Sequence, residues 1–189
     1  MIYLIRHGQT DANRNRYAGR EDVALNETGR DQASALAARL RHRSLVRIFC
    51  SPLSRAIETA TPLAIEHRLD VQLRPHLLEL DFGVLQGRNK MDHRLSLRHK
   101  HLYDPVSGGE SLLDVWQRIE AVSLEIRSVV DEQGSVAIVA HYWTNRLLFG
   151  QLTGLTLEAT AAAGSYKPET GSCREIVTNE IDRAVRFGV

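Results

Sequence analysis

The sequence predicts an α/β fold in which a mostly parallel central sheet lies between two layers of helices, with a short cap over one edge. Short apolar runs without polar alternation, such as residues 2–5 and 136–140, are typical of strands that are buried on both faces of a parallel sheet. Segments with apolar residues at helical spacing, such as 31–41 and 110–130, separate these runs. We therefore expect residues 1–189 to form one three-layer α/β/α sandwich domain.

The middle of the chain continues this alternation. A strand is expected over residues 47–50, followed by a helix over about 52–69. Pro62 lies inside that helix and should kink or break its hydrogen-bond ladder, because proline lacks the backbone N–H.

The last third of the chain predicts one more helix and two strands. The helix should run from residue 143 to about 152, and Gly154 suits its end. Strands are expected over 173–178 and 184–187, the second at an edge, and the stretch 158–171, rich in Ala, Gly and Thr, is expected to be a loop.

Composition restricts the function classes. The 189 residues are 43% hydrophobic and 25% charged, which suits one domain with a sizeable core. A net charge of +1 supplies no general attraction to nucleic acid or to a membrane. We find no membrane-spanning run and no signal-peptide pattern, and so expect a cytoplasmic protein. Cys50 and Cys173 are far apart with no companion at metal-ligand spacing, so neither a metal nor a cofactor is expected.

The first expected strand ends in a cation and an imidazole, in the motif Arg6-His7-Gly8. Ligands of open α/β sheets bind beyond the carboxyl ends of the strands. Gly8 has no Cβ, so it would let the backbone approach the ligand that His7 faces. A single histidine at a strand end is more often an ordinary hydrogen-bonded residue, so this interpretation depends on three other segments.

The second segment is the start of the helix that follows residues 47–50. Ser51 is a suitable N-cap and Pro52 suits the first turn, which places Arg55 about one turn into the helix. An anion is favoured near a helix N-terminus, and a guanidinium can contact phosphate oxygens in pairs. The alternative is that Arg55 is a solvated charge on the helix.

The third and fourth segments add an acid and a second imidazole. Glu79 and Asp81 lie in a stretch of Leu and Phe closed by glycines, where burial would raise the pKa of the Glu79 carboxyl and suit it as a general acid. Asp81 could share that role or cap a turn. The run 136–140 ends on His141, so two expected strands end in histidine.

Together these motifs resemble the histidine phosphatase superfamily, which includes cofactor-dependent phosphoglycerate mutases and many small phosphatases. The resemblance extends from residue 2 to about residue 155. The matching motifs are Arg6-His7-Gly8 with Thr10 and Asn13, Ser51-Pro52-Leu53-Ser54-Arg55-Ala56 with Glu58-Thr59-Ala60, Glu79 with Phe82-Gly83 and Gly87, Gly108-Gly109-Glu110-Ser111, and His141.

The resemblance implies phosphoryl transfer through a covalent phosphohistidine on His7. Glu79 would protonate the departing alkoxide and then take a proton from the attacking water, which predicts a bell-shaped dependence of rate on pH. The phosphoryl oxygens would be held by Arg6, Arg55, His141 and, as a neutral donor, Asn13. The further substrate-binding residues would be Gly8, Thr10, Gly19 and Tyr142.

Two positions depart from the family pattern. The second histidine of the family is usually followed by glycine, whereas His141 is followed by Tyr142 and Trp143, which could move the loop, narrow the pocket or add an aromatic wall. Ala18 stands before Gly19 where many relatives carry a polar side chain. A weakly active, phosphate-binding pseudoenzyme is therefore one alternative.

A mutase is the other alternative. Residues 83–90 resemble the mutase stretch, and Lys90 could contact a second acidic group, but residues 91–106 are short beside the mutase insertion that shields the phosphoenzyme from water. We therefore expect a metal-independent phosphatase acting on a small phosphomonoester whose identity the sequence does not reveal, and a homodimer stays open. The basic stretch of the cap is either a solvated face or an anion-recruiting lid: Arg94, Arg98, His99, Lys100 and His101.

Overall fold

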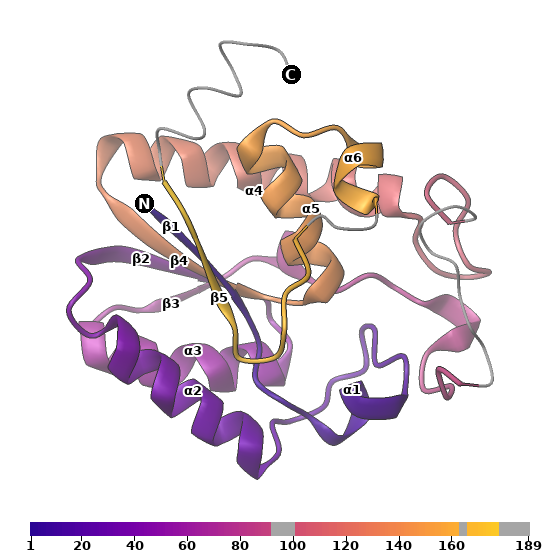
Figure 1. Ribbon diagram of the computed structural model, residues 1–189, viewed down its shortest axis with the longest axis horizontal. Coiled ribbons are helices and arrows are strands. Elements are labelled where there is room, and N and C mark those ends of the chain that lie inside the picture. The colour runs from indigo at the N-terminus through magenta and orange to yellow at the C-terminus, as the bar shows by residue number, and fades with distance from the viewer. Residues whose placement is uncertain (92–100, 163–165, 178–189) are drawn as a thin grey trace.

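The computed structural model describes residues 1–91, 101–162 and 166–177, and this part of the chain contains a five-stranded sheet of order β3-β2-β4-β1-β5 (Figure 1). Four strands are parallel, and β5 pairs antiparallel with β1 at one edge. The predicted α/β fold with a mostly parallel sheet is confirmed. The strands are β1 (Ile2–Arg6), β2 (Leu45–Cys50), β3 (Val71–Leu73), β4 (Ser135–Ala140) and β5 (Cys173–Ile176).

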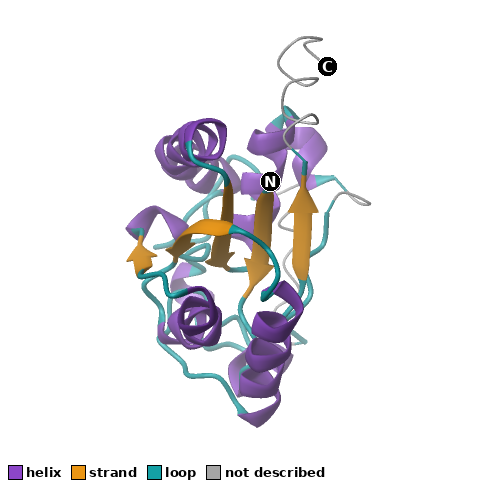
Figure 2. Ribbon diagram, turned by 90° about the vertical axis from the view of Figure 1, so that its left-hand side faces the viewer, coloured by secondary structure: helices purple, strands orange, loops and turns teal. Residues whose placement is uncertain are grey.

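Helices cover both faces of this sheet, as Figures 1 and 2 show. Ile2 and Leu4 of β1 pack into the core on one face, whereas Tyr3 and Ile5 pack into the core on the other. Both faces of the strand are therefore buried, which explains why its sequence shows no alternation of apolar and polar residues. The helices on one face are α2 (Glu27–Leu40) and α3 (Ser54–His67), and those on the other are α4 (Leu112–Glu132), α5 (Tyr142–Thr153) and α6 (Leu157–Ala161).

Three short elements lie outside the sandwich. The helix α1 (Asp11–Asn15) follows β1, and two 3₁₀ turns, Pro75–Leu77 and Gly83–Leu85, lie in the long connection between β3 and α4. These segments surround the carboxyl end of the sheet, where the candidate site lies.

Two expectations about helix position are wrong, and the helix break expected at Pro62 is absent. The helix α3 continues through Pro62 and ends at His67, with Arg68, whose backbone is left-handed with φ of 53°, as its C-cap. The first long helix begins four residues before the predicted start, because the Asn26 side chain accepts a hydrogen bond from Gly29 N at 2.9 Å. The stretch expected to be a loop contains α6, which Thr156 caps. The strand expected over 184–187 lies outside the described residues.

Ser51 is not the N-cap of α3. The helix begins at Ser54, and its cap residue Leu53 offers no side-chain hydrogen bond. Asp22 accepts a hydrogen bond from Ser54 N at 2.7 Å and thereby takes the role expected of Ser51. The hydroxyl of Ser51 therefore does not cap the helix and is available for a different hydrogen bond.

Candidate active site

Three neighbouring parallel strands deliver their next residues to one edge of the sheet. β1 leads to His7, β2 to Ser51 and β4 to His141. The ladder continues one residue beyond the strands, because His7 N donates to Ala140 O at 2.9 Å and Ser51 N donates to Val139 O at 3.0 Å. The rings of His7 and His141 lie 5.1 Å apart between centroids. The backbone of the sheet therefore holds the two histidines together, as the strand-end pattern predicts.

The imidazole of His7 is held in one tautomer. Its Nδ1 lies 2.7 Å from Gly8 O, and a carbonyl oxygen can only accept, so Nδ1 carries the hydrogen and Nε2 carries the lone pair. Burial, followed by the charges of Arg55 and Arg6, lowers the pKa of His7 well below its ordinary value. The ring is therefore neutral at physiological pH, as a nucleophile must be.

Two arginines supply positive charge beside His7. Arg55, only 1% exposed, donates from Nη1 to Glu21 O at 2.6 Å and from Nη2 to Gly19 O at 2.7 Å, which fixes the plane of its guanidinium. Arg6 donates to Pro168 O at 3.0 Å. The buried Nε of each arginine has no hydrogen-bond partner among the described residues. Buried N–H donors of this kind favour an anion.

His141 is a second candidate donor. Its Nε2 lies 2.7 Å from Ser51 Oγ, and that hydroxyl accepts a long hydrogen bond from Leu53 N at 3.5 Å. The hydroxyl hydrogen is then free to donate to Nε2, which leaves the imidazole hydrogen on Nδ1. His141 Nδ1 is buried and finds no partner in the described part of the chain. The sequence signals did not reveal the pairing of Ser51 with His141.

The carboxyl group of Glu79 lies at the N-terminus of α5. Its oxygens accept hydrogen bonds from the backbone N–H groups of Leu80 at 3.0 Å, Tyr142 at 3.0 Å and Trp143 at 3.1 Å. Glu79 is buried, as the stretch of Leu and Phe predicts, but free N–H groups at a helix start also bind its carboxylate. His141 is the N-cap residue of the same helix, so the acid and the second histidine adjoin the same helix start.

A cavity of about 320 Å³ opens beside these groups. Its wall includes six of the predicted site residues, and it adds two residues that the sequence signals did not single out, Arg16 and Tyr17. Aromatic rings pair in two places, Tyr17 with Phe82 at 4.9 Å and Tyr142 with Trp143 at 5.3 Å. The lining residues are Arg6, His7, Arg16, Tyr17, Ala18, Gly19, Arg55, Glu79, Phe82, Lys90, Tyr142 and Trp143.

Other predicted residues lie behind the cavity wall. Gly8 packs against α2, where a Cβ would lie 2.5 Å from Gly29 O, so close packing rather than approach of a ligand requires this glycine. Thr10 is fully buried. The side chain of Asn13 lies outside the described residues, as does the basic stretch of the cap apart from His101.

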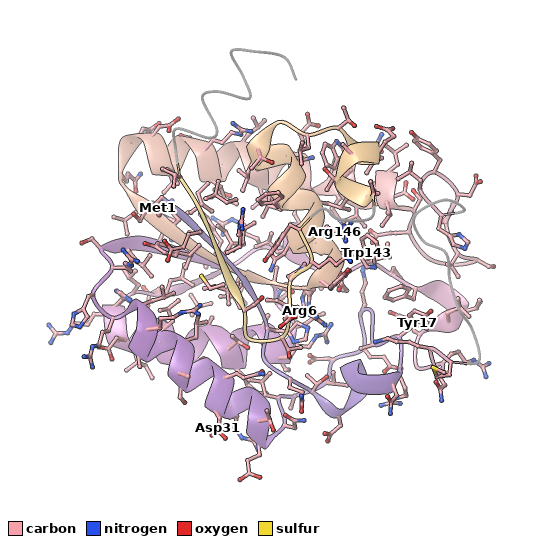
Figure 3. The ribbon with its side chains drawn as sticks, viewed as in Figure 1. Met1, Arg6, Tyr17, Asp31, Trp143 and Arg146 are labelled. Carbon is pink, nitrogen blue, oxygen red and sulfur yellow. The ribbon has the colours of Figure 1, made fainter. Side chains whose placement is uncertain are left out.

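Tyr142, the bulky residue after His141, lies in the wall of the cavity. Tyr142 uses its backbone N–H to bind Glu79, while its ring lies 5.3 Å from Arg6 Cζ. Figure 3 shows Arg6 close to the start of α5, where Trp143 and Arg146 lie. Tyr142 is therefore an aromatic wall that also supports one of the cations.

Two features are absent from the described ranges 1–91, 101–162 and 166–177. No group of three or more His, Cys, Asp or Glu residues there is arranged to hold a metal ion. No helix in these ranges is long and apolar enough to cross a membrane.

Comparisons with known proteins agree with this geometry. The family model described as histidine phosphatase superfamily (branch 1) matches residues 2–183. A solved mycobacterial glucosyl-3-phosphoglycerate phosphatase superposes with a TM-score of 0.77 at 31% identity, covering 88% of this chain and 85% of that one.

Curated relatives include phosphatases and a mutase. Phosphoserine phosphatase 1 of Hydrogenobacter thermophilus is 31% identical over 82% of this chain and 77% of that protein. The probable phosphoglycerate mutase GpmB of Proteus mirabilis is 31% identical over 82% and 75%. A bifunctional protein of Mycobacterium tuberculosis is 35% identical over 76% of this chain, which spans only 41% of that longer protein.

Proposed function

The chain belongs to the histidine phosphatase superfamily, and on this premise we propose that it hydrolyses a small phosphomonoester through a phosphohistidine on His7. The observation that carries the proposal is the hydrogen bond from His7 Nδ1 to Gly8 O, which leaves Nε2 as the free, unprotonated nitrogen. Membership of the family alone supports phosphatase or mutase chemistry. The hydrolytic outcome and the substrate class belong to the proposal.

In the first half of the reaction His7 Nε2 attacks phosphorus and the ester P–O bond breaks. The negative oxygens of the transferring group lie against Arg6, Arg55 and His141, whose buried Nε, Nε and Nδ1 donors, respectively, lack partners among the described residues. Glu79, which lines the same cavity as His7, gives its proton to the departing alkoxide oxygen. The products are an alcohol, a phosphohistidine and the carboxylate of Glu79.

In the second half a water molecule attacks phosphorus and the N–P bond breaks. The Glu79 carboxylate accepts the proton of the water, so the acid is restored while inorganic phosphate is released from His7 Nε2. Hydrogen bonds from the start of α5 stabilise the ionised carboxylate between the two halves. No metal or cofactor takes part in either half.

The outer part of the cavity suggests the class of substrate. Arg16 and Lys90 line it beyond the groups assigned to the phosphoryl oxygens, and burial followed by the charge of Arg6 lowers the pKa of Lys90. A second anionic group on the substrate would neutralise these cations. We therefore expect a phosphomonoester that carries a carboxylate or a second phosphate, with its carbon skeleton against Tyr17 and Trp143.

A mutase is the second candidate, because GpmB is a relative and Lys90 lines the cavity. A mutase would return the phosphoryl group from His7 to a second hydroxyl of the same or another molecule. Hydrolysis and mutase activity differ in whether inorganic phosphate or an isomeric ester accumulates.

The test is release of phosphate from a panel of phosphomonoesters in the presence of EDTA, with His7→Ala as the variant. The exposed His42 supplies the matched control, His42→Ala. We expect release by the wild type and by His42→Ala but none by His7→Ala, together with an acid-labile phosphoenzyme when turnover is quenched. Isomeric esters without phosphate release would favour the mutase, and phosphate binding without a phosphoenzyme would favour the pseudoenzyme.

A further inference from the structure

The backbone that carries Glu79 is not part of the sheet. Residues 78–82 follow a 3₁₀ turn and have no strand partner in the structure. Buried backbone groups still need hydrogen bonds, so something else must bind them. The position of the general acid therefore depends on contacts that the sheet does not supply.

Side chains from two distant segments bind this backbone. Arg118 of α4 donates from Nη1 to His76 O at 2.5 Å and to Leu78 O at 3.1 Å. Arg20 donates from Nε to the carbonyl oxygen of Glu79 itself at 3.3 Å. These contacts fix the carbonyl groups immediately before and at the acid.

Glu110 joins the two arginines. Its carboxylate accepts from Arg118 Nε at 3.0 Å and Nη2 at 3.1 Å, and from Arg20 Nη2 at 2.6 Å. It also accepts from Asp81 N at 3.1 Å, while Glu110 N donates to Asp81 O at 2.9 Å. The side chains of Glu110 and Arg118 are only 17% and 16% exposed, so these charge-assisted bonds are partly shielded from water.

We propose that Glu110, together with Arg118 and Arg20, is a positioning residue that holds the Glu79 carboxyl at the leaving-group oxygen. The proposal rests on the proposed function, in which Glu79 is the general acid. Glu110 does not line the cavity, so it acts through the backbone of residues 76–81 and not on the substrate. Loss of this shared carboxylate would loosen the segment, remove the carboxylate that pairs with Arg118, and leave Arg20 with its longer contact to Asp81 at 3.7 Å.

Esters with different leaving groups test the proposal. An alkyl phosphate needs a proton on its departing oxygen, whereas p-nitrophenyl phosphate does not. We expect Glu110→Gln to lower kcat/KM for an alkyl phosphate about tenfold or more, and for p-nitrophenyl phosphate less than about threefold, with the dissociation constant of inorganic phosphate unchanged. Equal losses on both esters would overturn the proposal.

A double variant separates positioning from general damage. If Glu110 acts through Glu79, then Glu110→Gln should cause no further loss when added to Glu79→Gln, because the group being positioned is already removed. A full additional loss in the double variant would show that Glu110 acts elsewhere.

The matched control is Glu125→Gln. Glu125 lies on the same helix α4 and makes a similar paired contact with Arg74, at 2.9 Å to Nε and 2.6 Å to Nη2, but lies outside the cavity. Glu125→Gln removes a comparable ion pair whose hydrogen bonds go to Arg74 and not to the carbonyl groups next to Glu79. We expect the kinetics of this variant to match the wild type on both esters.

A measurement independent of turnover distinguishes failure of this inference from failure of the proposed function. The amide hydrogens of Tyr142 and Trp143 donate to Glu79, so their exchange with solvent reports the position of its carboxylate. We expect Glu110→Gln to speed their exchange about tenfold and Glu125→Gln to leave it unchanged. Unchanged exchange in Glu110→Gln would refute the inference even in a protein that hydrolyses no ester.

Discussion

The two halves of the candidate site are built by different means. His7 and His141 follow directly from β1 and β4, and backbone hydrogen bonds continue between them beyond the last strand residues. Glu79, by contrast, lies on a segment without strand partners, held by the side chains of Arg20, Arg118 and Glu110. The nucleophile is thus placed by main-chain pairing and the acid by a cluster of charges.

This difference determines which amino-acid substitutions each half of the site tolerates. A sheet ladder depends little on side-chain identity, so its geometry fails mainly by steric clash or by loss of the functional group itself. A cluster of side chains fails when any member is replaced, because each remaining charge loses a partner. The predictions below test this contrast.

The largest effect is expected at Arg55, which lines the cavity together with His7 of one half and Glu79 of the other. Arg55→Lys cannot reproduce the paired bonds to Glu21 O and Gly19 O and removes the guanidinium from the cavity. We expect kcat/KM to fall about a hundredfold and the dissociation constant of inorganic phosphate to rise in parallel. Steady-state kinetics and calorimetry measure both quantities.

Arg47→Lys is the control for that substitution, since Arg47 donates to the exposed side chain of Gln133 and does not line the described cavity. Near-normal kinetics of Arg55→Lys would contradict this prediction, because any cation at position 55 would then suffice for activity.

A pair of glycine variants compares the steric tolerance of the two halves. A Cβ on Gly8 would lie 2.5 Å from Gly29 O, and one on Gly109 would lie 2.4 Å from Asp81 O. Gly8→Ala should lower the free energy of unfolding by about 2 kcal/mol, because the new methyl group would clash with the backbone of α2. Gly109→Ala should lower it less, because side chains and not a sheet ladder hold the facing residues 78–82. Urea denaturation measures both, and equal losses would contradict the contrast.

The dependence of stability on pH should arise in the histidine half. Burial, followed by the charge of Arg55, lowers the pKa values of His7 and His141 well below 6.5, so the folded chain resists protons that the unfolded chain accepts. Above about pH 6.5 both histidines are neutral in the folded and the unfolded chain, so they do not affect stability. As the pH drops below that value the unfolded chain binds protons that the folded chain does not, and the free energy of unfolding falls. Urea midpoints between about pH 5 and 8 should decline less steeply for His7→Gln than for the wild type. Parallel curves would contradict the prediction.

The smallest effect is expected at the aromatic wall. Tyr142→Phe removes only the hydroxyl that accepts from Arg146 Nη1 at 3.3 Å, so kcat/KM should change less than about twofold. Tyr142→Gly, which restores the usual family residue, removes the ring beneath Arg6 and should raise KM about threefold. A large loss in Tyr142→Phe would show that the hydroxyl, and not the ring, is the important group.

The sheet half of the site could be predicted from sequence. Apolar runs that end abruptly at His7 and His141 indicate strand ends, and parallel strands bring their carboxyl ends to one edge. The fold class follows from the same runs, because a strand such as Ile2–Arg6 without polar alternation needs cover on both faces.

The other half could not be predicted in the same way. Two of the partners of Glu79 are the backbone N–H groups of Tyr142 and Trp143, more than sixty residues away, and no side-chain pattern in the sequence indicates them. Ser51 looked like a helix cap because local signals favour it there, but Asp22 takes that place through a tertiary contact. Pro62 was expected to disturb α3, yet the helix continues past it.

The start of α5 carries a consequence for precision. His141 is its cap residue, and its first N–H groups bind the Glu79 carboxylate, so one helix start contacts both the second histidine and the acid. The charged cluster meanwhile holds the backbone of the segment that carries Glu79. The acid is thus anchored at both ends, its main chain by arginine side chains and its carboxylate by the helix that begins at the second histidine.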